Sequence, residues 1–176
     1  MALKAHKEFF DASVFLGMHG DDDEVRKACM HFFASRFCGV ALTSLDQVGK
    51  CDDVIWRRPR LLQDAYYPFM DRLHSEMRIV REPFSEAELK RAFADPRLRR
   101  LPVGDRLLLA KVIEAGGSLF SIKAHLTARS DLPVCSPATG SETDFPAEVA
   151  GLYHTSLQLR IPMEEIQEWA MGGMEG

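Results

Sequence analysis

The chain lacks long hydrophobic runs, and this shortage excludes membrane-spanning proteins. No apolar run reaches the roughly 20 residues that a transmembrane helix needs. The N-terminal stretch also lacks the long apolar segment of a secretory signal. The sequence therefore predicts a cytoplasmic protein with no membrane association.

Cysteine is also scarce, and basic residues are outnumbered by acidic ones, 22 to 26. The 4 cysteines of this 176-residue chain form no C-x-x-C pair and show no zinc-ligand spacing. Because disulfides are rare in reducing compartments, we expect Cys29, Cys38, Cys51 and Cys135 to be free thiols. The formal net charge of −4 gives no general attraction for nucleic acid, so RNA binding would need a local basic patch.

Apolar segments of strand type alternate with helical patterns over most of the chain. The predicted strands cover 8–16, 40–43, 78–80, 118–122 and 132–134. The predicted helices between them cover 25–37, 45–56, 61–77, 85–88 and 104–115. Strands that alternate with helices favour a parallel sheet with helices on both faces. The sequence therefore predicts an α/β fold with a parallel sheet of about four to five strands flanked by helices.

The C-terminal part has a different pattern. A turn-rich linker follows Cys135, and two further helices are expected over 146–159 and 162–171, each opened by a proline. We expect an α/β domain over residues 1–136, followed by a linker and a helical C-terminal extension over 137–176.

Two carboxylates stand out against apolar surroundings. Asp11 interrupts the hydrophobic run 9–16, and Asp105 opens the apolar helix 104–115. An Asp in such a run is costly unless a partner, often a metal ion, compensates its charge. Ligands of parallel α/β sheets bind at the carboxyl ends of the strands, where both carboxylates could meet. As ordinary alternatives, Asp11 could cap a turn, and Asp105 could be a common acid of a helix N-terminus.

These motifs resemble those of PIN domains, a fold of metal-dependent nucleases, over about residues 8–135. Asp11-Ala12-Ser13 and the stretch 105–110 are similar to the first and third acidic motifs of that family. The position of the second acid falls on Gly49, with Asp46 and Asp53 about one helical turn to either side. At the fourth motif, Ser121-Ile122-Lys123, a lysine stands where the family has its last aspartate.

The resemblance implies a ribonuclease that depends on Mg²⁺ or Mn²⁺. Asp11 and Asp105 would be the metal ligands, with Asp46 or Asp53 as an auxiliary acid. Ser13 would orient a ligand or water. RNA phosphates would be held by basic side chains. Three of them lie just before Asp105, and the fourth belongs to the fourth motif: Arg97, Arg99, Arg100 and Lys123. A solvated loop is the ordinary alternative for the arginines.

Lys123 and Gly49 favour a second hypothesis, a degenerate scaffold without a metal site. The ammonium of Lys123 would pair with Asp11 or Asp105, and the old cleft would bind a protein, a peptide or a small molecule. PIN domains are common in toxin–antitoxin pairs and often dimerise, so the resemblance also permits a third hypothesis, a toxin-like nuclease that is controlled by a partner protein, and it permits a homodimer. His19 and His125 are minor candidates near the same site.

Overall fold

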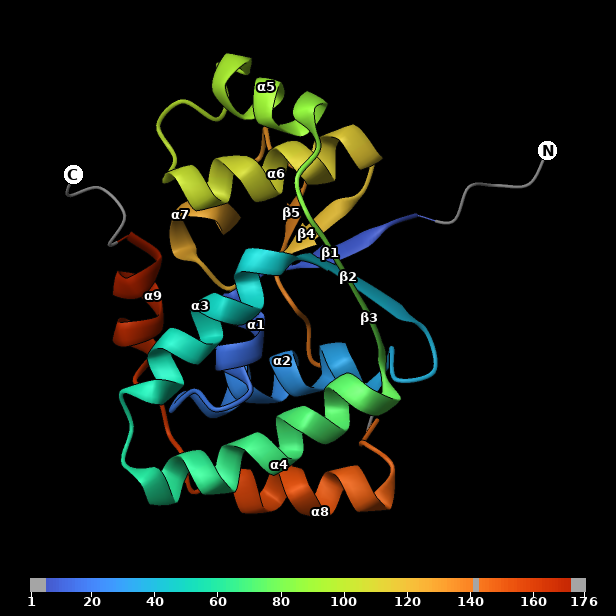
Figure 1. Cartoon of the computed structure of the whole chain (residues 1–176), viewed down its shortest axis with the longest axis vertical. Coiled ribbons are helices and arrows are strands. Elements are labelled where there is room, and N and C mark those ends of the chain that lie inside the picture. Colours follow the sequence, from blue (N-terminus) through green and yellow to red (C-terminus); the bar gives the residue numbers. More distant parts are fainter. Residues whose placement is uncertain (1–5, 141–142, 172–176) are drawn as a thin grey trace.

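A parallel β-sheet forms the centre of the computed structural model, which describes residues 6–140 and 143–171 (Figure 1). The five strands of this described part run in the order β3-β2-β1-β4-β5, and all neighbours are parallel. They are β1 (Glu8–Phe10), β2 (Val40–Ser44), β3 (Arg78–Glu82), β4 (Ser118–Phe120) and β5 (Val134–Cys135). The predicted α/β fold with a parallel sheet is confirmed.

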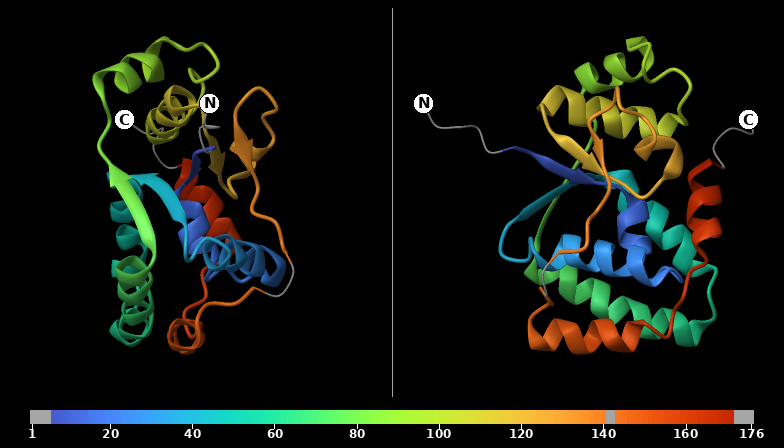
Figure 2. Two further views of the ribbon diagram at one scale, coloured as in Figure 1. Left: turned by 90° about the vertical axis from the view of Figure 1, so that its right-hand side faces the viewer. Right: turned by 180° about the vertical axis from the view of Figure 1, so that it is seen from behind.

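Helices cover both faces of the sheet (Figures 1 and 2). One side carries α5 (Glu86–Ala94), α6 (Val103–Ala115) and the short α7 (Ala124–Thr127). The other side carries α1 (Ala12–Gly17), α2 (Asp23–Ala34), α3 (Leu45–Trp56), α4 (Arg60–Glu76), α8 (Ala147–Ser156) and α9 (Met163–Met171). Two hydrophobic cores result, one on each face.

Strand β1 is the middle strand of the sheet, paired with β2 and β4, and its side chains alternate between the two cores. Phe10 packs edge-to-face against Phe15 and Phe33, with ring centroids 4.6 Å and 5.1 Å away. Phe9 instead lies in the opposite core with Leu108 and Leu109 of α6. Burial of both phenylalanines fixes the strand in the middle of the sheet and therefore fixes the position of Asp11, which follows it.

The predicted strand over 8–16 is wrong beyond Phe10. Asp11 is the N-cap of α1, and its side chain accepts a hydrogen bond from the backbone N–H of Ser13. Every residue of α1 is buried, so the helix shows no polar face that would distinguish it from a buried strand. The continuous apolar run thus contains a short strand and a short helix, with the carboxylate at the point where one changes to the other.

The other predicted elements lie within a few residues of the observed ones. The capping box of Ser85 and Glu88 is present, although its helix continues to Ala94. Gly116 ends α6 in the left-handed conformation with φ of 64°. Strand β4 ends at Phe120, earlier than predicted, and the sequence analysis missed α7.

The C-terminal helices pack into the core on the α4 side. Helix α8 lies along α4, and α9 contacts α1 (Figure 2). Val149, Tyr153 and Ile166 are buried there. An isolated β-bridge also joins Gly20 to Ile161. Helices α8 and α9 therefore complete one core face, although the boundary at residue 136 stays a prediction.

All four cysteines are free thiols. None of the helices in the described ranges is long and apolar enough to cross a membrane.

Candidate functional site

The predicted carboxylates meet at the carboxyl ends of neighbouring strands. Strands β1 and β4 are paired in parallel, so Asp11 after β1 lies beside Ser121 and Lys123 after β4. Helix α6 brings Asp105 to the same place from its first turn. We call Asp11, Asp105, Lys123 and His125 the central cluster.

Asp11 is fully buried, and both of its carboxylate oxygens are hydrogen-bonded. Oδ1 accepts from the backbone N–H of Ser13 at 3.0 Å and from the Ser13 hydroxyl at 2.5 Å. Oδ2 accepts from the hydroxyl of Ser121 at 2.6 Å and lies 3.6 Å from Nζ of Lys123. The carboxylate thus has the opposite charge and hydrogen bonds that its burial requires.

Asp105 lies between Lys123 and His125 and bonds to both. Its Oδ1 accepts a hydrogen bond from Nζ of Lys123 at 2.6 Å, and its Oδ2 accepts one from Nε2 of His125 at 2.8 Å. Both Lys123 and Asp105 are buried, with relative exposures of 2% and 4%. Charge-assisted hydrogen bonds of this length are among the stronger polar contacts in proteins.

The pKa values in this pair shift in opposite directions. Burial raises the pKa of Asp105, but the hydrogen bond from His125 and the charge of Lys123 outweigh burial and lower it overall. Burial lowers the pKa of Lys123, but attraction to Asp11 and Asp105 outweighs burial and raises it overall. Both groups therefore stay charged over the neutral pH range, as a buried ion pair.

Ser13 and Ser121 hold the segment after β4 in place. The backbone N–H of Ile122 donates to the Ser13 hydroxyl at 3.1 Å. The N–H of Lys123 donates to the Ser121 hydroxyl, also at 3.1 Å. Ser13 was predicted to orient a ligand or water, and in this structure it contacts Asp11 and the backbone that directs Lys123.

Asp46 lies in a second group of contacts on α3. Its carboxylate accepts hydrogen bonds from Ser44 at 2.5 Å and Gln47 at 3.0 Å, and it pairs with Lys50 at 3.1 Å. The amide oxygen of Gln47 accepts from the N–H of Ala12 at 2.9 Å, which ties this group to the residue after Asp11. A Cβ atom at Gly104 would lie 2.5 Å from Nζ of Lys50, so this ammonium reaches the start of α6.

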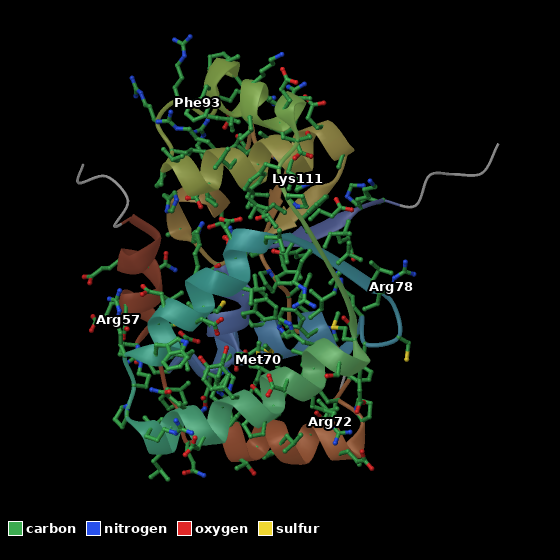
Figure 3. The ribbon with its side chains drawn as sticks, viewed as in Figure 1. Arg57, Met70, Arg72, Arg78, Phe93 and Lys111 are labelled. Atoms are coloured by element: carbon green, nitrogen blue, oxygen red, sulfur yellow. The ribbon has the colours of Figure 1, made fainter. Side chains whose placement is uncertain are left out.

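Of the two auxiliary acids, the structure brings Asp46 towards the central cluster and leaves Asp53 outside. Asp53 pairs with Arg57 across one turn, and both side chains are more than half exposed. Arg57 lies on the outside of the molecule at the end of α3 (Figure 3). Gly49 is exposed, and a Cβ atom there would meet nothing within 4 Å.

The donor set of the central cluster does not fit Mg²⁺ or Mn²⁺ while Lys123 has this position. Such ions need free carboxylate oxygens, and the oxygens of Asp11 and Asp105 accept from serine, lysine and histidine groups. The ammonium between them would also repel a second cation. Across the described ranges, no three His, Cys, Asp or Glu side chains are grouped to hold a metal ion.

The predicted arginines lie on an exposed turn between α5 and α6. Arg97 donates to Asp95 at 2.7 Å, and its pKa is raised by that hydrogen bond. The backbone carbonyl of Arg99 accepts from Arg106, whereas the side chains of Arg99 and Arg100 are exposed. The side chain of Arg97 contacts Asp95 and Asp131 and not the central cluster.

The two minor histidine candidates have different surroundings. His125 is part of the central cluster. His19 is buried instead among the rings of Tyr66, Phe69 and Tyr153, and its Nε2 lies 2.8 Å from the hydroxyl of Ser156. Burial and the nearby arginines lower the pKa of His19 to about 3, so it is a neutral core residue.

Sequence reasoning missed Gln47 and Lys50. Lys50 follows Asp46 by four residues, a spacing that places the two side chains together on a helix, so this pair had a signal in the sequence. Gln47 had none, because its contact with Ala12 depends on how α3 packs against α1.

The arrangement as a whole defines an α/β protein with a buried lysine–aspartate cluster at the carboxyl ends of its central strands. A solved structure has a similar fold: one chain of a toxin–antitoxin complex from Klebsiella pneumoniae, with a TM-score of 0.51 and 17% identity. That match covers 74% of this chain and 98% of the other. At this identity the likeness concerns the fold alone.

The family assignment rests on a match to nearly the whole chain. The model of DUF6190, described as a family of unknown function, matches residues 1–166, so the chain belongs to that family. No curated protein matches the chain.

Proposed function

We propose that this chain is a PIN-like scaffold in which Lys123 replaces the metal ion, and that it acts by binding a partner protein in a pair of the toxin–antitoxin type. The observation that carries the proposal is the ammonium of Lys123, which lies 2.6 Å from Asp105 and 3.6 Å from Asp11. One positive charge thus lies between two buried carboxylates. The fixed lysine supplies the compensation that a divalent cation would otherwise give.

The carboxylate on α3 is compensated in the same way. Asp46 pairs with Lys50, whose ammonium lies at the start of α6. The two predicted metal ligands, Asp11 and Asp105, and the auxiliary acid Asp46 are therefore all paired with lysine.

A protein partner is supported by the rim of this site and by the related fold. Leu45 at the start of α3 and Val103 at the start of α6 are 55% and 48% exposed. They are on the helices that carry Asp46 and Asp105. Apolar side chains on such a rim favour contact with another protein over contact with RNA phosphates. The similar solved chain is described as part of a toxin–antitoxin complex.

A metal-dependent ribonuclease is the second candidate. It is favoured by the convergence of Asp11 and Asp105 at the carboxyl ends of the strands, with Asp46 nearby on α3. This candidate requires Lys123 to leave its place between the carboxylates. RNA binding and homodimer formation belong to this candidate and stay predictions.

Titration of Mn²⁺ and Mg²⁺ into the protein, followed by calorimetry, separates the two candidates. We expect no saturable heat from the parent protein and no RNA cleavage in the presence of either ion. Saturable binding that disappears in Asp11→Asn, together with cleavage lost in the same variant, would establish the ribonuclease instead.

Partner binding is tested with a rim variant, Leu45→Asp/Val103→Asp, which changes two exposed side chains. We expect a protein of defined mass to form a stoichiometric complex with the parent and not with this variant. Asp53→Asn, on the outside of α3, is the matched control and should keep the complex. A complex that survives the rim variant would place the partner elsewhere and would contradict the proposed surface.

A further inference from the structure

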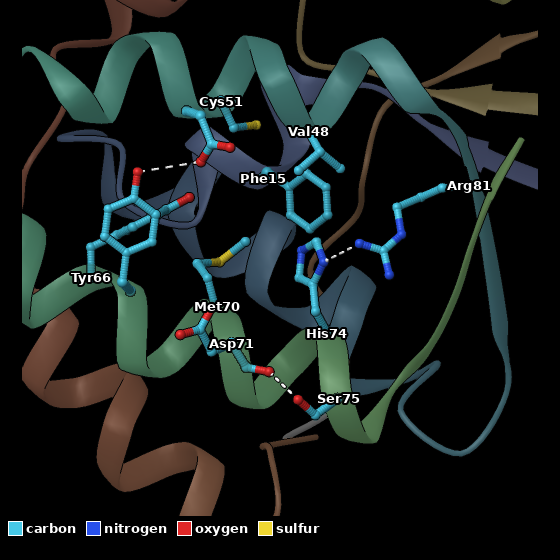
Figure 4. A pocket seen from close by; sticks show the side chains of 11 residues that line it. Phe15, Val48, Cys51, Tyr66, Met70, Asp71, His74, Ser75 and Arg81 are labelled. Atoms are coloured by element: carbon cyan, nitrogen blue, oxygen red, sulfur yellow. Dashed lines mark hydrogen bonds between the residues drawn. The ribbon is translucent and has the colours of Figure 1, made fainter. Parts of the chain in front are cut away.

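A separate pocket of about 510 Å³ lies between α3 and α4 (Figure 4). Helix α3 contributes Cys51 and Asp52, helix α4 contributes Tyr66 and His74, and Phe15 of α1 lies behind them. None of the lining residues belongs to the central cluster. The volume is within the range typical of small-molecule sites.

The wall of this pocket carries two carboxylates without ion-pair partners among the described residues, Asp52 and Asp71. The side chain of Asp52 accepts a hydrogen bond from the Tyr67 hydroxyl at 3.3 Å. Burial raises the pKa of Asp52, and the charge of Asp71 raises it further. Because both carboxylates line the same wall, a cation in the pocket would be attracted to each of them.

Arg81, the basic side chain that lines the pocket, already has a hydrogen-bond partner. Arg81 donates a hydrogen bond to Nδ1 of His74 at 3.1 Å. Burial and the charge of Arg81 lower the pKa of His74 to about 4, so the imidazole is neutral near pH 7. His74 in turn stacks on Phe15, with ring centroids 5.3 Å apart. This end of the pocket is therefore an uncharged aromatic surface with Arg81 at its edge.

Tyr66 supplies an unused polar atom between these two ends. The side chain is 2% exposed, and its hydroxyl has no hydrogen-bond partner within the part of the chain that the structure describes. Figure 4 shows this side chain extending from α4 towards the middle of the pocket. A buried hydroxyl without a partner is destabilising, and a hydrogen-bond donor on a ligand would satisfy it.

We propose that this pocket binds a small organic cation, namely a primary amine attached to an aromatic or apolar body. The ammonium would donate hydrogen bonds to Asp52 and to the hydroxyl oxygen of Tyr66. The rings of Tyr66 and Tyr67, which meet edge-to-face at 5.5 Å, provide surfaces that attract cations. Phe15 and Met70 provide apolar contact for the body of the ligand. This site is independent of the proposed function of the central cluster.

An anionic ligand fits the same pocket less well. Arg81 would have to bind it while keeping its contact with His74, and both carboxylates would repel it. The sign of the ligand charge is therefore the sharpest test of the proposal, and it needs no variant protein.

The first experiment compares three probes of similar shape by calorimetry at neutral pH: phenethylamine, phenethyl alcohol and phenylacetate. We expect the amine to bind at least about tenfold more tightly than the alcohol, since a charge-assisted hydrogen bond contributes about 1.5–3 kcal/mol. Phenylacetate should not bind. Binding of phenylacetate as tight as that of the amine, or no binding of the amine at millimolar concentration, would overturn the proposal.

The second experiment locates the bound amine. Asp52→Asn should weaken phenethylamine binding about tenfold or more, and Tyr66→Phe by a smaller factor of about two to ten. Asp53→Asn is the matched control, because Asp53 is the next residue of α3, is exposed and pairs with Arg57. Equal loss of affinity in Asp52→Asn and Asp53→Asn would show only a general effect of charge and would reject the site.

Discussion

The ammonium of Lys123 lies 2.6 Å from a carboxylate oxygen of Asp105, and both side chains are buried. A buried ion pair does not by itself make a fold stable, because the cost of desolvating both groups offsets much of their attraction. Removal of one partner, in contrast, strongly destabilises the fold, because it leaves the other charge buried and unpaired. This asymmetry makes Lys123 the most informative position for mutation.

Replacement of Lys123 by methionine tests its structural role. Lys123→Met keeps the length of the side chain and removes the charge between Asp11 and Asp105. We expect the free energy of unfolding to fall by about 3–5 kcal/mol, measured by urea denaturation. Lys50→Met is the control, because the Lys50–Asp46 pair is partly exposed and should lose no more than about 1 kcal/mol. Equal effects would contradict a special role for Lys123.

Reversal of the charge at the same position tests whether the cluster can accept a metal ion. Lys123→Asp places a third carboxylate beside Asp11 and Asp105, so the variant should be less stable than the parent without divalent ions. We expect Mn²⁺ to raise its melting temperature in a concentration-dependent way and to leave the parent unchanged. If Mn²⁺ does not change the melting temperature of Lys123→Asp, the surrounding serines and His125 do not allow the metal ion to be coordinated.

The buried side chain of His19 predicts that the protein loses stability in acid. The pKa of His19 is lowered from 6.5 to about 3, so the unfolded chain binds a proton that the folded chain does not. Stability is therefore complete above pH 6.5 and falls as the pH decreases towards 3. His19→Phe should reduce the slope of stability against pH by about 1.4 kcal/mol per pH unit between pH 6 and 4. An unchanged slope would mean that His19 already takes up a proton in the folded state.

Two glycines on α1 and α3 should respond to alanine in opposite ways. Gly49 is exposed inside α3 and has space for a Cβ, so Gly49→Ala should stabilise the protein by about 0.5–1 kcal/mol. At Gly17, a Cβ would lie 2.5 Å from Sγ of Cys29 and 2.9 Å from Ile122, so Gly17→Ala should destabilise it by about 1–3 kcal/mol. Thermal unfolding of both variants measures this contrast, and a destabilised Gly49→Ala would disprove the first expectation.

The fold class was predictable because alternation of strand and helix patterns has few architectural solutions. The meeting of Asp11 and Asp105 was also predictable, since the carboxyl ends of parallel strands share one edge. The run 9–16 was misread because burial removes the periodicity that separates helix from strand. The direction of the Lys123 side chain was not predictable, because Lys123 lies beyond the end of β4 as the N-cap of the short helix α7.

The central position of β1 in the sheet affects how the chain folds during synthesis. Strand β1 pairs with β4, and Asp11 bonds to Ser121, which is 110 residues further along. Contacts between such distant segments carry a large loop-closure cost and slow the search for the native pairing. On the ribosome, Asp11 emerges before Ser121 and Lys123 and stays hydrated until these two residues have left the exit tunnel. The apolar residues around Asp11 are exposed for the same period, so the nascent chain presents a hydrophobic segment of the kind that chaperones shield.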